Sequence, residues 1–211
     1  MTAPAPLPLL SLPPGPFQLI LADPPWATLL WSGAVRTPTQ KTGADHYPVM
    51  TAAALQALPV EACAAPDAVL AMWTIGSHLD QALALGRAWG FAYATDLFYW
   101  LKQKKLRPDQ RDLFTGDVAA LPIGMGKYTR KQIEPCLLFT RGKGLKVASH
   151  AVRQIIVAPK RAHSRKPVEQ YAALDALFGL TPDRLELFSR TPRNGWTAWG
   201  NELGKFGEEP E

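Results

Sequence analysis

Short apolar runs alternate with helical patterns along most of the chain, and this alternation constrains the fold more than any other feature. The apolar runs are the expected strands and comprise residues 17–22, 68–75, 96–101, 134–140, 154–158 and 184–188. Helical patterns cover residues 51–64, 78–89 and 167–178. Strands that alternate with helices in this way predict an α/β fold with a mostly parallel sheet covered by helices on both faces.

The length and composition favour one domain. A chain of 211 residues that are 47% hydrophobic can bury one sizeable core, so we expect a single domain over residues 1–211. Within it, the proline-rich residues 1–16 are expected to form an extended arm, and the acidic residues 204–211 a frayed tail.

Two cysteines far apart in the sequence indicate neither a disulfide nor a metal site. The chain begins without a signal-peptide pattern, and no apolar segment approaches the roughly 20 residues that cross a bilayer. We therefore expect a cytoplasmic protein with no metal and no membrane contact. The oligomeric state stays open.

The first apolar run, LILA, stops abruptly at Asp23-Pro24-Pro25-Trp26. A buried strand there delivers Asp23 to the carboxyl edge of the sheet, where ligands gather in open parallel sheets. The two prolines fix their φ angles and lack N–H groups, so their carbonyls stay available as rigid acceptors. Acceptors followed by an aromatic plane suit a flat ligand that bears an amine. The alternative for Asp23 is a helix cap.

The middle of the chain is strongly basic. Residues 102–166 hold 16 of the 23 Lys and Arg residues but only four of the 18 acids. The cations gather in four clusters, LKQKKLRPDQR, GKYTRKQ, RGKGLK and APKRAHSRK. A basic run is commonly just a solvated surface. Four clusters between apolar segments instead indicate loops gathered along one rim to meet phosphates, so we expect a nucleic acid partner.

Eight segments in order resemble the MT-A70 family of S-adenosylmethionine-dependent adenine N6-methyltransferases. They are DPPW, HYPVM, AMWTIG, WGFAYATDLFYWLK, GMGKYTRKQIEPCLLFTRGKG, HSRKP, RLELFSR and GWTAWGNE, and they extend from about Phe17 to Leu203. The resemblance implies a Rossmann-like methyltransferase fold with a permuted strand order, in which the DPPW strand comes first and the cofactor strand last. "ELFSR" then stands in place of a glycine-rich cofactor loop.

The resemblance also implies which residues perform methyl transfer. Asp23 and the Pro24 carbonyl are the expected acceptors for the adenine amine, with Pro25 and Trp26 completing the catalytic motif. Their contribution is orientation and electrostatic preorganisation. Trp26 or Tyr47 is expected to stack on the base, a contact worth about 1–3 kcal/mol. The alternative for Tyr47 is ordinary packing.

The implied cofactor is S-adenosyl-L-methionine. The expected cofactor-binding residues are Asp23, Lys166, Phe188, Arg190, Asn194, Asn201 and Glu202. These types fit, because a carboxylate pairs with cations and a ribose with amides. The expected nucleic acid contacts are Tyr47, Lys102, Lys104, Lys105, Lys127, Arg130 and Glu134. One departure is that the segment before DPPW contains no acid to contact the cofactor adenine.

The compact chain resembles bacterial and phage members, for which DNA is the usual substrate, so we favour DNA over RNA. Duplex DNA would require the adenine to be flipped out, at a cost of a few kcal/mol. Two alternatives remain at this point: an RNA adenosine methyltransferase, and a nucleic-acid-binding scaffold of the same fold without activity. The intact DPPW argues against the scaffold, which has no need of an acceptor pair.

Overall fold

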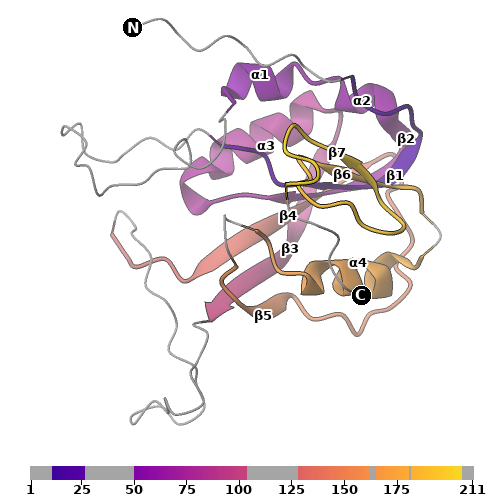
Figure 1. The fold of residues 1–211 in the computed structure, drawn as a ribbon. Helices are drawn as coiled ribbons and strands as arrows, with labels where there is room; N and C mark the ends of the chain where they lie inside the picture. The colour runs from indigo at the N-terminus through magenta and orange to yellow at the C-terminus, as the bar shows by residue number, and fades with distance from the viewer. Residues whose placement is uncertain (1–10, 27–49, 104–127, 162–164, 181, 206–211) are drawn as a thin grey trace, which may run out of the picture.

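The structure is a computed structural model that describes residues 11–26, 50–103, 128–161, 165–180 and 182–205 (Figure 1). Its strands are β1 (Phe17–Ala22), β2 (Ala64–Trp73), β3 (Ala92–Gln103), β4 (Ile133–Arg141), β5 (Ile155–Pro159), β6 (Arg184–Leu187) and β7 (Thr197–Trp199). Its helices are α1 (Ala52–Gln56), α2 (Val60–Cys63), the 3-10 turn η2 (Gly76–His78), α3 (Leu79–Ala88) and α4 (Glu169–Phe178).

One seven-stranded sheet in the order β5-β3-β4-β2-β1-β6-β7 forms the centre of the molecule. β4 runs antiparallel to both of its neighbours, and every other neighbouring pair is parallel. The expected mostly parallel α/β sheet is therefore confirmed. β4 directly follows β3 in the chain, so it pairs with β3 without the crossover that a parallel strand needs.

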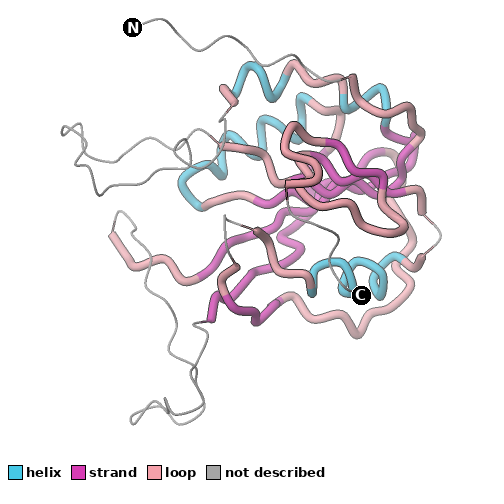
Figure 2. The backbone as a smooth tube through the Cα atoms, viewed as in Figure 1, coloured by secondary structure: helices cyan, strands magenta, loops and turns pink. Residues whose placement is uncertain are grey.

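Helices cover both faces of the sheet (Figure 2). α1, α2 and α3 contribute Leu55, Val60 and Leu85 to the core on one face, and α4 contributes Leu174 to the core on the other. The second half of β1, Leu19–Ala22, is apolar because its alternate residues enter different cores: Ile20 and Ala22 enter one, and Leu19 and Leu21 enter the other. Burial on both faces thus leaves this part of the strand without a polar side.

Gly86 lets α3 approach the sheet closely. A Cβ at this position would lie 2.2 Å from the Phe139 ring of β4, so any larger residue would push the helix away. Phe139 is fully buried, which leaves it little room to move.

Several elements differ from the expectation. The predicted helix 51–64 is broken at Pro59 into α1 and α2, because proline cannot donate to the preceding turn. β2 comprises Ala64–Trp73 rather than residues 68–75, and β3 comprises Ala92–Gln103 rather than residues 96–101. β7 was not predicted at all, since three residues are too few for an alternation pattern, and it adds to β6 as a parallel edge strand. The expected cofactor strand, β6, is therefore followed by one more short strand.

The described end of the proline-rich arm lies against the domain. The Ser11 carbonyl accepts from Trp199 Nε1 at 3.1 Å, and Leu12 packs against the core. Residues 1–10 and most of the acidic tail, 206–211, lie outside the described residues. In the part of the chain that is described, no helix has the length and apolar character that a bilayer crossing needs.

Candidate active site

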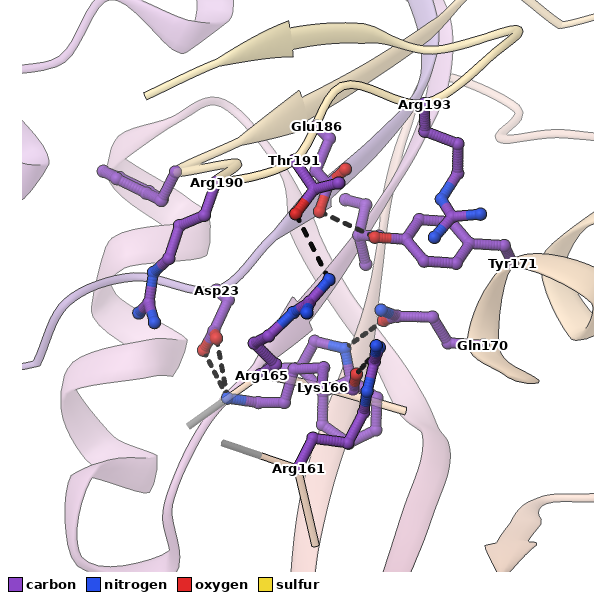
Figure 3. Close-up of a pocket in the computed structure, with 13 residues that line it drawn as sticks. Asp23, Arg161, Arg165, Lys166, Gln170, Tyr171, Glu186, Arg190, Thr191 and Arg193 are labelled. Atoms are coloured by element: carbon purple, nitrogen blue, oxygen red, sulfur yellow. Dashed lines mark hydrogen bonds and ion pairs between the residues drawn. The ribbon is translucent and has the colours of Figure 1, made fainter. Parts of the chain in front are cut away.

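The candidate site lies where β1, β2 and β6 end. Ala22 of β1 pairs with Met72 of β2 and with Leu187 of β6, so the residues that follow these three come together at one edge of the sheet. Asp23 follows β1 and Phe188 follows β6. The pocket at this edge is lined by Leu21, Asp23, Trp73, Arg161, Arg165, Lys166, Gln170, Tyr171, Glu186, Phe188, Arg190, Thr191 and Arg193 (Figure 3).

The DPPW segment forms a tight and well-anchored turn. The Trp26 N–H donates to the Pro24 carbonyl at 2.8 Å, and the Met50 N–H donates to the Pro25 carbonyl at 3.1 Å. A carbonyl oxygen has two lone pairs, so the Pro24 oxygen keeps the capacity to accept a second hydrogen bond. The turn holds that acceptor in a fixed direction.

Trp26 is a buried anchor of this turn. Its side chain is only 6% exposed, its Nε1 donates to the Trp73 carbonyl at 3.3 Å, and its ring lies against His78 with centroids 5.9 Å apart. A ring held in this way presents little free face to a base. Of the two residues expected to stack on adenine, Tyr47 is therefore the better candidate, although it lies outside the described residues.

Lys166 contacts Asp23, from which it is distant in the sequence. Its Nζ donates to both carboxylate oxygens of Asp23, at 2.7 Å each, across 143 residues of sequence. It also lies 3.6 Å from Glu134 Oε2, and Lys102 pairs with the other oxygen of Glu134. Figure 3 shows the Lys166 ammonium facing Asp23 from the segment that precedes α4. Asp23, Lys166, Glu134 and Lys102 thus form one chain of alternating charges.

Glu134 reaches this edge because β4 is antiparallel. The strand begins where its neighbours end, so its second residue lies beside the carboxyl end of β2. Burial by itself would raise the pKa of Glu134, but Lys166 and Lys102 outweigh burial and hold that pKa below its ordinary value. Glu134 is therefore an ionised partner of both lysines at neutral pH.

Phe188 and Arg190 follow β6 into the pocket. Phe188 adopts φ 63°, a left-handed conformation that is uncommon for a residue with a Cβ and that turns the chain sharply at the strand end. Its ring stacks on Trp89 with centroids 6.5 Å apart and meets Trp199 edge-on at 5.6 Å. Arg190 pairs through its Nε with Glu202, at 3.3 Å. Both residues line the pocket.

Some of the expected site residues that the structure describes do not line the pocket. Asn194 and Asn201 are exposed and do not line the pocket, and Arg130 is also exposed. Four more, Tyr47, Lys104, Lys105 and Lys127, lie outside the described residues.

Glu186, Tyr171 and Arg193 line the pocket but were missed by the sequence analysis. Glu186 Oε1 accepts from the Tyr171 hydroxyl at 2.9 Å, and the Arg193 guanidinium lies 3.7 Å from the Tyr171 ring centroid. Glu186 Oε2 is buried and has no hydrogen-bond partner among the described residues. Burial raises the pKa of Glu186 to about 7 even though Tyr171 donates to it. An acid inside the apolar run RLELF was the signal that could have found it.

Glu186→Gln is expected to stabilise the protein in a pH-dependent way. The folded-state pKa of Glu186, about 7, lies above its ordinary value of 4.5, so the wild-type carboxyl weakens the folded state as pH rises from 4.5 to 7. The free energy of unfolding of E186Q relative to wild type should rise over that window by up to about 3 kcal/mol. Urea unfolding at pH 5 and pH 8 measures it. The exposed acid Glu169 supplies the control, E169Q, and a difference between E186Q and wild type that does not change with pH contradicts the prediction.

Comparison with known proteins identifies the family. The MT-A70 family model matches residues 17–202. The type II methyltransferase M.MunI of a Mycoplasma species is 31% identical over 92% of this chain and 80% of its own length. A probable N(6)-adenosine-methyltransferase MT-A70-like protein of rice is 30% identical over 90% of this chain. The human N(6)-adenine-specific methyltransferase METTL4 is 26% identical over 90% of this chain.

The chain spans 23% of the rice relative and 38% of the human one, so it corresponds to part of those proteins but to most of the Mycoplasma relative. The match begins with β1 and extends past β7, so it includes every strand that shapes the pocket. The chain therefore belongs to the MT-A70 family.

Proposed function

We propose that the protein transfers a methyl group from S-adenosyl-L-methionine to the exocyclic amine of adenine in DNA. The observation that carries the proposal is the position of Asp23: it ends a buried strand, sits in a rigid turn beside the Pro24 carbonyl, and borders a pocket that contains charges of both signs. Membership of the family, whose named relatives include adenine methyltransferases, supports the same reaction.

The acceptors act on the nucleophile. The lone pair of the adenine amine is delocalised into the ring, so the amine is a poor nucleophile in solution. Asp23 and the Pro24 carbonyl accept from its two N–H groups, draw the lone pair back onto nitrogen and aim it at the methyl group. The cofactor, when bound, would supply that methyl group from its sulfonium. The amine nitrogen would bond to the methyl carbon as the sulfur–carbon bond breaks, the sulfur would keep the bonding electrons, and the proton that the amine loses would pass to water.

The pocket fits the methionine end of the cofactor, which carries one carboxylate and one ammonium. Lys166 and Arg190 line the pocket and match the carboxylate. Glu186 Oε2, buried without a hydrogen-bond partner among the described residues, matches the ammonium. The expected cofactor contacts of Asn194, Asn201 and Glu202 stay predictions.

DNA is preferred to RNA as the substrate because of the similarity to the relative named a type II methyltransferase, which is 31% identical over 92% of this chain. A relative named an N6-methyladenosine RNA methyltransferase, from Cryphonectria parasitica, is 29% identical over 92% of this chain, so RNA stays the second candidate.

The test is methylation of matched DNA and RNA oligonucleotides with isotope-labelled cofactor, followed by nucleoside analysis. We expect label in N6-methyldeoxyadenosine. Label in N6-methyladenosine alone would move the substrate to RNA. Cofactor binding without transfer to either oligonucleotide would contradict the proposal and favour the scaffold.

A further inference from the structure

A second pocket lies beside the active site, between the end of β5 and the start of α4. Three cations, Lys160, Arg161 and Arg165, line it together with Ala158, Pro159, Val168 and Glu169. Its cavity volume is about 290 Å³. A water molecule takes about 30 Å³ in the liquid, so the cavity has room for a phosphate group with part of its hydration shell. We propose that this second pocket binds a backbone phosphate of the target strand next to the methylated adenine.

The second pocket is adjacent to the active-site pocket, because two arginines line both of them. Arg161 and Arg165 line both pockets and so form the wall between them. Arg161 Nη1 donates to the Lys166 carbonyl at 3.4 Å, and Arg165 Nη2 donates to Thr191 Oγ1 at 3.3 Å. In Figure 3 both side chains lie beside Lys166. A strand with its adenine at Asp23 therefore has its adjoining backbone close to this wall.

The electrostatics of the second pocket favour an anion. Three cations face one acid, Glu169, in its lining. α4 also begins here, with Val168 as its N-cap and without a side-chain cap, so the positive end of the helix dipole adds to the field of the three cations. Guanidinium and ammonium groups around a helix N-terminus are the donors that a phosphate takes.

Of the anionic groups that take part in the reaction, only the phosphates of the nucleic acid are not yet assigned to a site. The cofactor carboxylate is assigned to Lys166 and Arg190 in the active site, and neither of these residues lines the second pocket. The remaining anions are the phosphates of the nucleic acid. The inference thus rests on the proposed function and adds to it a defined contact on the substrate backbone.

Lys160→Gln is the cleanest test. Lys160 is exposed and absent from the active-site lining, and its backbone N–H, which the substitution keeps, donates to the Gln103 carbonyl at 3.2 Å. In K160Q the slope of log affinity for duplex DNA against log salt should become less negative by up to about 0.9, the value for one phosphate contact. Cofactor affinity should match wild type, because Lys160 does not line the active-site pocket.

Lys146→Gln is the matched control. Lys146 is also exposed, but it follows β4, whose end lies at the opposite edge of the sheet from Asp23. Its salt slope should equal that of wild type. An unchanged slope in K160Q, with methylation intact, overturns the second pocket as a phosphate site and leaves the proposed function standing.

A methylphosphonate scan locates the phosphate. Each linkage around the methylated adenine is made neutral in turn, and the affinities of wild type and K160Q are compared. At the linkage held by the second pocket, neutralisation should weaken binding to wild type more than binding to K160Q, because K160Q has already lost one of the three cations that contact this phosphate. Additive losses at every linkage overturn the inference. If no oligonucleotide is methylated, the proposed function fails, while the salt slope, which needs only binding, still decides whether the second pocket contacts a phosphate.

Discussion

Asp23→Ala is expected to lower the single-turnover rate of methylation by roughly 10²–10⁴-fold, the range for loss of one positioned acid–base or electrostatic group. The substitution removes the side-chain acceptor of the adenine amine and leaves only the Pro24 carbonyl. Cofactor affinity should change much less than the rate, because Lys166 keeps Glu134 as a partner at 3.6 Å. Rapid-quench methylation with labelled cofactor measures the rate, and calorimetry measures the affinity.

Two further variants control for D23A. Asp23→Asn keeps one acceptor oxygen and should retain more activity than D23A. Glu61→Ala removes an acid that pairs with Arg141 at 3.2 Å, away from the pocket, and should leave the rate unchanged. If the D23A rate is within about tenfold of wild type, the loss of rate is smaller than the range for such a group. That result would contradict the assignment of Asp23 as an acceptor of the adenine amine.

Lys166→Ala and Arg190→Ala should each weaken cofactor binding by about 10- to 100-fold, since a hydrogen bond to a charged group is worth about 1.5–3 kcal/mol. Both side chains line the pocket, and each loss leaves the cofactor carboxylate without one charged donor. Lys166→Ala also leaves Asp23 and Glu134 without the ammonium that they share. Calorimetry with S-adenosylhomocysteine measures the affinity.

The control for both variants is nucleic acid affinity without cofactor, at matched salt. It should change much less than cofactor affinity, because the proposed phosphate contact lies in the second pocket. Lys146→Ala, at the opposite edge of the sheet, should change neither quantity. If both variants bind the cofactor normally but lose nucleic acid, the assignment of these two cations to the cofactor is wrong.

Sequence patterns predicted the elements of the fold well where burial was complete. β1 was predicted at its observed bounds, because Leu19–Ala22 is an apolar run buried on both faces that stops at the charged Asp23. Sequence patterns predicted the short elements poorly. α2 and β7 are four and three residues long, and tertiary packing rather than local pattern maintains them.

The site was predicted only in part, for reasons specific to each residue. Asp23 and Lys166 stood out because the DPPW and HSRKP segments surround them with unusual local chemistry. Glu186 carried no such motif, and only its burial beside Tyr171 gives it a raised pKa and a place in the pocket. Trp26 belonged to the motif, yet packing against Trp73 and His78 makes it an anchor rather than an open stacking surface.

The sequence by itself determined the α/β class, the buried first strand and the rigid acceptor turn at its end, because these depend on local hydrophobicity and on proline geometry. Only the tertiary structure decided which charges meet. Lys166 reaches Asp23 across 143 residues, and Glu134 joins them because β4 enters the sheet antiparallel and so begins where its neighbours end. Contacts of this kind depend on strand order and direction, which no local pattern of residues encodes.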